Sequence, residues 1–478
     1  MTYRIGHHDD CDYDGLGTLL EDEVLQPGDL VELLPTHTYT ASLKWTYPVP
    51  GVVDPITFRG INDANGKRPF FDGRGITMKA PRAFFEMYGS NGEGGVRIDD
   101  GAWVIENLEF AYAINATNEM NAAGVRNANA ASVIVRGCKI WNCASGVMSS
   151  ESSGETIIED CDIGFCGYGD GHSHCIYTSG MTFRLRHSRI HDSIWGQNVK
   201  SRNRFVEIAH NQIFYSRDGE IGVIQAGDGT PEDSQLTSQP GSNALILDNE
   251  IVTRPDRSGG NKNAVVVFGK DMGTVGRNGT LYFHGNKINA QNAENIPIKL
   301  SGSTTTLDAR HNKFIGAVDI LDERDPAVEV YGEANWVDET ANEPDAFISP
   351  AIYTFEMGDG AFEAAPANRR LHSAIATPQN LRDWDDQGGL GIQWDAVPGA
   401  LFYRVWRAQL VNGQGVDEST IWGGATDTQY VDTFQHGPSS DSKRNQYVYR
   451  VQAVDLNGSQ SELSIGWIKE HGEPGYAE

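Results

Sequence analysis

The sequence is poor in basic residues, in cysteine and in long apolar runs. Its 478 residues include 38 lysine and arginine residues against 65 aspartate and glutamate residues, a formal net charge of −27. Nucleic-acid affinity rests largely on neutralising phosphates with Lys and Arg, so this excess of acid argues against a nucleic-acid partner. No apolar run approaches the roughly 18 residues of a membrane span. Six cysteines are too few for a disulfide scaffold.

Glycine is abundant, with 54 residues, and the middle of the chain repeats a short pattern. Two mostly apolar residues at positions −5 and −3 precede a small polar residue or cysteine at position 0, and Ile or Phe follows at +2. The spacing between successive repeats is 23 to 38 residues. A unit of about 23 residues with alternating strands is typical of one coil of a right-handed parallel β-helix. Position 0 is occupied by Cys138, Cys161, Ser188, Asn211, Asn249, Asn286 and Asn312.

The position-0 residues predict stacking between coils. Asparagine recurs there in four consecutive repeats, and a side-chain amide at a tight bend can bond to the same amide one coil away, which predicts an asparagine ladder. Cys138 over Cys161, and Cys143 over Cys166, are expected to stack as buried free thiols. A disulfide between stacked cysteines is the alternative, because the coil spacing of about 4.8 Å would permit one.

The chain divides by composition into three parts. Residues 1–336 are predicted to form the β-helix, with a helix over 18–25 that covers its open end. Residues 337–375 are predicted to be a linker or strap. Residues 376–478 look like a fibronectin type III β-sandwich, with Trp394 as core tryptophan and Tyr447 as tyrosine corner. The predicted fold class is therefore all-β.

A further strand follows each bend of the β-helix, and its alternation decides which side chains face outward. Aligning Val147, Ile176, Val199 and Val223 places Lys200 outward, with Tyr177 one coil above and Ile224 one coil below. Two longer loops are expected to wall a groove over Lys200. One is the segment with Asp170, His172 and His174, and the other spans 227–242.

Segments near the start, PGDLVELLPTHTY, PITFRGIN and RPFFDG, complete the pattern. With them, residues 18–336 resemble the parallel β-helix polysaccharide lyases of the pectate-lyase-like superfamily, most closely the alginate-lyase and chondroitinase-B-like branch. The resemblance implies an enzyme, a carbon–oxygen lyase that cleaves an acidic, uronate-containing polysaccharide by β-elimination. Lyases of this branch use a Lys on one coil, an Arg on the next and acidic calcium ligands nearby. Here the coil after Lys200 offers Ile224, Gln225 and Ala226, so the second cation would be Arg202 on the same strand.

β-Elimination beside a carboxylate needs a cation, a base and an acid. We expect Lys200 and Arg202 to neutralise the uronate carboxylate. Tyr177 and His172 are the candidates for base and acid, since a cation one coil away stabilises a phenolate and histidine titrates near neutrality. The predicted substrate-binding residues are Asn198, His174, Arg184 and Gln225.

A metal site is a further hypothesis. His172 and His174 could form a metal pair, but no third ligand stands at a definable spacing. Calcium is considered as a cofactor because of the resemblance, with Asp170, Glu220 and Asp228 as candidate ligands. No other cofactor is expected.

Two other functions stay open. A glycoside hydrolase or phage-type depolymerase would need two outward carboxylates about 5–10 Å apart, and the strand face around Lys200 offers none. A glycan-binding or structural solenoid would need no catalytic residues. The first residues, MTYRIGHHDDCDYDG, lack the basic and apolar regions of a signal peptide. We expect an extracellular or periplasmic protein whose signal peptide is absent from this sequence, with a virion-associated or an intracellular protein as the alternatives.

Overall fold

The computed structural model divides the chain into two compact units, an N-terminal and a C-terminal one, and each is described by itself. The account concerns the residues that the structure describes: 1–74, 76, 78, 81–92, 100–114, 122–167, 173–254, 264–271, 273–290, 296–302, 305–316, 321–323, 329–333, 335–338, 375–384, 390–411, 414–425, 428–432, 445–455, 461, 464 and 467–471.

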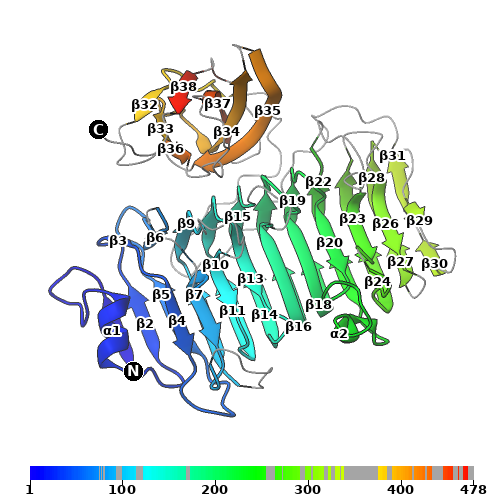
Figure 1. Cartoon of the computed structure of the whole chain (residues 1–478), viewed down its shortest axis with the longest axis horizontal. Helices are drawn as coiled ribbons and strands as arrows, with labels where there is room; N and C mark the ends of the chain where they lie inside the picture. Colours follow the sequence, from blue (N-terminus) through cyan, green and yellow to red (C-terminus); the bar gives the residue numbers. More distant parts are fainter. Residues whose placement is uncertain are drawn as a thin grey trace. The chain divides into compact units, whose positions relative to one another are not determined.

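The N-terminal unit is a parallel β-helix (Figure 1), as the repeat predicts. A 20-stranded parallel sheet covers two of its faces and an 11-stranded sheet covers the third. β16 (Ile176–Arg186) and β18 (Val199–Ala209) run through both faces of the larger sheet. Other coils place separate strands on the two faces.

The Lys200 face is formed by the first halves of β16 and β18 together with eight separate strands. These are β4 (Leu43–Thr46), β7 (Ala83–Tyr88), β10 (Ala123–Asn127), β13 (Ser145–Ser149), β20 (Ile221–Ile224), β23 (Ala264–Gly269), β26 (Ile296–Ser301) and β29 (Leu321–Glu323).

The ion-pair face is the other part of the 20-stranded sheet, and its outward side chains alternate in charge from coil to coil. The column Arg4, Glu32, Arg59, Glu106, Arg136 and Glu159 follows the strand register. Opposite charges opposed across parallel strands favour this register over a slipped one. The face consists of the second halves of β16 and β18 with β1 (Thr2–Ile5), β2 (Leu30–Leu33), β5 (Ile56–Gly60), β8 (Ala102–Glu106), β11 (Ser132–Arg136), β14 (Glu155–Glu159), β21 (Ala244–Leu247), β24 (Gly279–His284), β27 (Thr305–Arg310) and β30 (Glu329–Glu333).

The short-strand face is the 11-stranded sheet. Its central residue in most strands, such as Ile140, Ile163 and Ile190, points inward and is fully buried. The face consists of β3 (Thr38–Tyr39), β6 (Phe70–Asp72), β9 (Glu109–Ala111), β12 (Lys139–Trp141), β15 (Asp162–Gly164), β17 (Arg189–His191), β19 (Gln212–Phe214), β22 (Glu250–Val252), β25 (Lys287–Asn289), β28 (Lys313–Ile315) and β31 (Trp336–Asp338).

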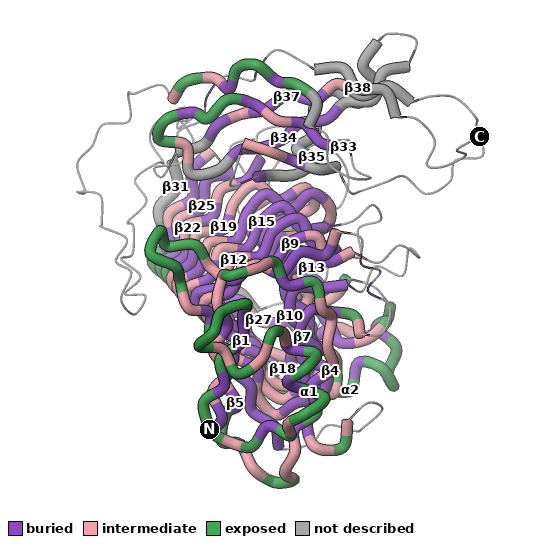
Figure 2. The backbone as a smooth tube through the Cα atoms, turned by 90° about the vertical axis from the view of Figure 1, so that its left-hand side faces the viewer, coloured by how far each residue is buried: buried purple, intermediate pink, exposed green. Residues whose placement is uncertain are grey.

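The inward side chains of the coils stack into one continuous apolar core, which gives the buried stretches along the strands in Figure 2. The register pairs Val133 with Thr156, Thr156 with Phe183, and Phe183 with Val206, as the sequence alignment of the repeats predicts. Each coil buries apolar side chains only against its neighbours, so the core extends along the solenoid rather than around a centre.

The asparagine ladder is confirmed, and it continues one coil further than predicted, to Asn335. The side chain of Asn211 donates to Oδ1 of Asn249 (3.0 Å), and that of Asn249 donates to Oδ1 of Asn286 (3.0 Å). The same oxygens accept backbone N–H groups, for example Asn211 N to Asn249 Oδ1 at 2.9 Å. The ladder therefore satisfies polar groups at buried bends that would otherwise have no partner.

Replacement of Asn249 by alanine is expected to lower the free energy of unfolding by about 2–4 kcal/mol, because it orphans several buried polar groups, each costing about 1–3 kcal/mol. The backbone carbonyl of Ile208 and the N–H of Asn211 both lose their bonds to the Asn249 side chain. Denaturant unfolding measures the change. Asn65→Ala at an exposed turn is the control, with an expected change within about 0.5 kcal/mol, and equal stability of the two variants would contradict the role of the ladder.

The five buried cysteines, Cys138, Cys143, Cys161, Cys166 and Cys175, are free thiols. Cys138 and Cys161 stack as predicted, with the backbone N–H of Cys138 3.4 Å from Sγ of Cys161. Cys138 and Cys161 thus continue the column of position-0 residues into the first two repeats.

The N-terminal helix α1 spans Leu16–Asp22, so it begins two residues before the predicted 18–25 and ends three residues earlier. Leu16 and Leu19 are buried in the core of the β-helix. Among the residues that the structure describes, no helix is long and apolar enough to cross a membrane.

The C-terminal unit contains two antiparallel sheets, ordered β32-β33-β36 and β35-β34-β37-β38, around one apolar core. Trp394 lies in this core with 1% of its surface exposed, as predicted. The side chain of Tyr447 lies outside the described residues, and the fibronectin type III assignment and the domain boundaries stay predictions. The strands are β32 (Arg382–Trp384), β33 (Leu390–Gln393), β34 (Ala400–Val411), β35 (Gln414–Ala425), β36 (Gln429–Asp432), β37 (Asn445–Asp455) and β38 (Trp467–His471).

Candidate functional site

Lys200 lies on the outward side of β18, one coil after Tyr177, as predicted. The same outward column continues back to Met148 on β13. The next coil is different from the prediction, because Lys200 pairs with Gly222 and not with Ile224. Val199 aligns with Ile221 instead of Val223, a shift of two residues that keeps every side chain on its predicted side of the sheet.

Two side chains lie next to the Lys200 ammonium group. Its Nζ lies 5.9 Å from the centre of the Tyr177 ring and 3.3 Å from Oδ2 of Asp271. The Lys200 side chain is 13% exposed and that of Asp271 is 43% exposed. Burial lowers the pKa of Lys200, the Asp271 carboxylate opposes this shift, and the charge of Arg202 adds to it.

Arg202 lies on the same strand, two residues after Lys200, but its guanidinium is directed into the protein. Nη1 donates to the backbone carbonyl of Gln225 (3.1 Å) and to that of Gly227, and the residue is only 7% exposed. Arg202 therefore anchors the segment that follows β20. Its charge still acts on Lys200 electrostatically.

The long loop after β20 turns back across neighbouring coils. The backbone N–H of Gly227 donates to a carboxylate oxygen of Glu151 (3.1 Å), which follows β13. In strand order β16 and β18 lie between β13 and β20, so the contact spans the coils that carry Tyr177 and Lys200. This agrees with the predicted wall on this side of Lys200. The loop contains a short helix, α2 (Gln235–Ser238).

His174 packs against the candidate site from its other end. Its ring lies edge-on to Tyr177, with ring centres 5.1 Å apart, and its Nδ1 accepts the backbone N–H of Gln197 (2.8 Å). His174 is 2% exposed, so it supports Tyr177 rather than presenting an open ring to a substrate.

Three predicted substrate-binding residues have other partners. Asn198 is fully buried and donates to the Phe214 carbonyl (2.8 Å) and to the Glu220 carboxylate (2.7 Å). Gln225 is fully buried, and its Oε1 accepts the backbone N–H of Asp271 (2.8 Å). Arg184 lies on the ion-pair face, where it pairs with Glu155 (2.8 Å) and Glu207 (3.3 Å). Asn198 precedes β18 and is held at the bend before it, where Ser193 N–H also donates to its side chain (3.2 Å).

Calcium binding stays a prediction, and two of its candidate ligands, Glu220 and Asp228, lie among the described residues. Glu220 is fully buried and also accepts the backbone N–H of Ser216 (3.2 Å), and Asp228 is exposed on the loop after β20. Asp170 and His172 lie outside the described residues. Among the described residues, no group of three His, Cys, Asp or Glu side chains could hold a metal ion.

The sequence reasoning missed two acidic residues near Lys200. Asp271 follows β23, two coils beyond Lys200, and Asp218 precedes β20. Both carboxylates raise the pKa of Lys200 against the effect of burial, and Asp218 also accepts the backbone N–H of Gly196 (3.0 Å). The register places Val267, not Asp271, two coils from Lys200, so the repeat itself gave no signal for this contact.

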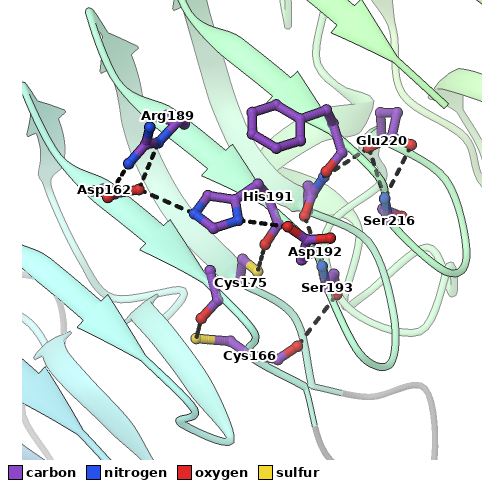
Figure 3. A network of polar contacts seen from close by, with 12 residues as sticks. Asp162, Cys166, Cys175, Arg189, His191, Asp192, Ser193, Ser216 and Glu220 are labelled. Atoms are coloured by element: carbon purple, nitrogen blue, oxygen red, sulfur yellow. Dashed lines mark hydrogen bonds and ion pairs between the residues drawn. The ribbon is translucent and has the colours of Figure 1, made fainter. Parts of the chain in front are cut away.

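A second polar cluster surrounds the buried His191 (Figure 3). His191 is fully buried between two carboxylates, with Nδ1 2.8 Å from Asp192 Oδ2 and Nε2 3.1 Å from Asp162 Oδ1. Arg189 pairs with Asp162 as well. The His191 ring stacks on Phe214, with ring centres 5.1 Å apart. Because His191 has no exposed surface, it cannot contact a polymer, and its hydrogen bonds stabilise the stacked coils.

Asp162 makes stability depend on pH. Burial raises the pKa of this carboxyl, but the charge of Arg189 and the hydrogen bond with His191 outweigh it and hold the pKa well below its usual range. The carboxylate thus contributes stability above its unfolded pKa of about 4, and this contribution is lost as the pH falls toward the lower folded value. Asp162→Asn is expected to reduce the loss of stability between about pH 5 and pH 2 in denaturant titrations. An unchanged acid profile would contradict this assignment.

The comparisons with known proteins give likenesses of fold. No protein-family model and no curated protein sequence matches the chain. A solved DFA-IIIase from Arthrobacter chlorophenolicus A6 is 12% identical, with a TM-score of 0.39 and coverage of 71% of this chain and 99% of that one. An alginate lyase from Paenibacillus is 16% identical, with a TM-score of 0.31 and coverage of 67% and 95%. An Fn3-like protein from Clostridium thermocellum is 31% identical over 20% of this chain and 92% of that one, with a TM-score of 0.16.

Proposed function

We propose that the protein degrades an acidic, uronate-containing polysaccharide by β-elimination on the Lys200 face. The observation that carries this proposal is the position of Lys200 itself. In a chain of net charge −27, a partly exposed ammonium group lies on a strand face beside the Tyr177 ring. A substrate carboxylate would be attracted to this cation, and the partial burial of the ammonium group strengthens such an interaction.

The proposed reaction needs the charge of Lys200 to acidify the proton at C5 of the uronate. As a base removes this proton, the electrons of the C5–H bond form the C4–C5 double bond. The bond between C4 and the glycosidic oxygen breaks, and the leaving oxygen takes up a proton from an acid. Negative charge develops on the carboxylate during proton removal, so a cation there stabilises the transition state more than the ground state.

Tyr177 is the candidate for proton transfer because its ring lies next to Lys200 and is held by His174. His172 remains the second candidate from the sequence. Arg202 would act by positioning, since it anchors the loop after β20 and adds to the local positive charge. No step of this mechanism requires calcium.

A second candidate function is glycoside hydrolysis, and a specific observation favours considering it. Asp218 and Asp271 both act electrostatically on Lys200, so two carboxylates accompany the candidate site. Hydrolases of polysaccharides use a carboxylate pair as acid and as base or nucleophile. A glycan-binding solenoid without catalysis is the third alternative. We propose an extracellular, periplasmic or virion-associated location, where such a polymer is met.

The proposal is tested with a panel of alginate, pectate, glucuronan and glycosaminoglycans. Ultraviolet absorbance detects the unsaturated product of β-elimination, and a reducing-end assay detects any cleavage. We expect both signals to rise together on at least one acidic glycan. Reducing ends without absorbance would support the hydrolase, binding without product would support the glycan-binding solenoid, and no response at all would contradict the proposal.

A further inference from the structure

The protein itself supplies a carboxylate that pairs with the Lys200 ammonium group, that of Asp271. Asp271 comes from the segment after β23 and approaches Lys200 Nζ to 3.3 Å, although 71 residues separate the two in the sequence. It is also the more exposed partner, at 43% against 13% for Lys200. Asp271 therefore covers the ammonium group on its solvent side, where a substrate carboxylate would arrive.

Gly222 carries no side chain between Lys200 and the coil of Asp271. In the outward column the order is Lys200 on β18, Gly222 on β20 and Val267 on β23. The side-chain amide of Gln197 lies over Gly222, where an added Cβ atom would come within 2.6 Å of it. The coil spacing of about 4.8 Å puts β18 and β23 roughly 10 Å apart, which a lysine side chain leaning across a glycine can span.

The backbone holds Asp271 in place independently of Lys200. Its N–H donates to Oε1 of the fully buried Gln225. The backbone carbonyl of Gln225 accepts a hydrogen bond from Arg202. Further along, Arg277 is fully buried and donates to the carbonyls of Ser242 (2.9 Å) and Ile224 (3.2 Å). A carboxylate fixed in this way loses little conformational entropy when it pairs with Lys200.

We propose that Asp271 is a built-in counter-ion that occupies the carboxylate position of Lys200, and that an anionic sugar binds by displacing it. This proposal rests on the function proposed above. A neutral glycan has no group to replace the lost ion pair, whereas a uronate exchanges one carboxylate for another. Asp271 thus lowers the affinity of every ligand at this position. Because only an anionic ligand replaces the lost ion pair, Asp271 also favours anionic ligands over neutral ones.

Asp271→Asn tests the proposal with trigalacturonate and with oligoguluronate as probes, using isothermal titration calorimetry. The amide keeps the shape of the side chain and removes its charge, so we expect affinity to rise about three- to tenfold. Lys200→Met is expected to lose binding. Glu21→Gln removes one charge from an exposed position of α1 and is expected to leave affinity unchanged. If Asp271→Asn binds as the parent does or more weakly, the proposal is overturned.

A second measurement needs no glycan, so it separates this proposal from the proposed function. An amine-reactive reagent labels neutral lysine, and mass spectrometry follows the labelling of Lys200 against pH. Asp271 raises the pKa of Lys200 against the effect of burial, while Arg202 lowers it and Asp218 raises it in both proteins. Asp271→Asn is therefore expected to move the labelling midpoint of Lys200 to lower pH, with exposed Lys67 as the internal reference. An unmoved midpoint overturns the counter-ion role even if glycans bind, and a moved midpoint without any glycan binding supports it while the proposed function fails.

Discussion

Replacing Lys200 by methionine is expected to lower kcat/KM for the acidic polysaccharide about 100- to 1000-fold, the effect of removing one preorganised group that stabilises charge in a transition state. Methionine keeps most of the apolar stem that passes Tyr177 and removes only the ammonium group. Initial rates from the absorbance of the unsaturated product measure the change.

The fold should tolerate this replacement, which makes the result interpretable. The Lys200–Asp271 ion pair is partly exposed, with Asp271 at 43%, and such a pair contributes no more than about 1 kcal/mol to stability. Thermal unfolding of Lys200→Met should therefore match that of the parent. Lys67→Met at an exposed turn is the control for loss of a positive charge. A Lys200→Met variant with full activity would show that the chemistry lies elsewhere.

Replacing His191 by phenylalanine is expected to lower the free energy of unfolding of the N-terminal unit by about 2–4 kcal/mol, because two carboxylates each lose a hydrogen bond worth about 1–3 kcal/mol. The ring of His191 contacts Phe214, Phe165 and Trp141, so phenylalanine suits the apolar part of its environment. The loss then reports the polar contacts, because Asp192 and Asp162 each lose a hydrogen bond to the imidazole.

Denaturant unfolding near neutral pH measures this change. His8→Phe is the matched control, because the His8 side chain is 62% exposed and its replacement should cost no more than about 0.5 kcal/mol. A His191→Phe variant that loses less than about 1 kcal/mol would mean that the two carboxylates find other partners.

The repeat was predictable because each coil of the β-helix needs the same kinds of residue at the same positions, so the pattern recurs in the sequence. One coil buries side chains only against the next, so position 0 and the apolar positions recur, and the asparagine ladder follows from them. The pairing of Tyr177 with Lys200 was predicted in the same way. The pairing beyond Lys200 was not, because Ile221 and Val223 are both apolar and two residues apart, and a period of two fits either.

The surroundings of Lys200 could not be predicted from alternation. Lys200 and Arg202 share the outward side of β18, yet only Lys200 keeps a partly exposed polar end, because Arg202 donates to the segment after β20. Asn198, just before the strand, is fully buried and donates to the Phe214 carbonyl. The contact with Asp271 depends on how the chain runs after β23. Whether a side chain points outward follows from alternation within its own strand. Its exposure and its ion pairing depend on loops from distant coils.

The central claim is that the Lys200 face cleaves an acidic glycan by elimination rather than by adding water. The most direct measurement is digestion of the responsive glycan in water labelled with the heavy oxygen isotope, followed by mass spectrometry of the products. The account predicts unsaturated oligosaccharides without the heavy isotope, formed by the parent protein and not by Lys200→Met. Saturated products that carry the isotope at the newly formed end would contradict it.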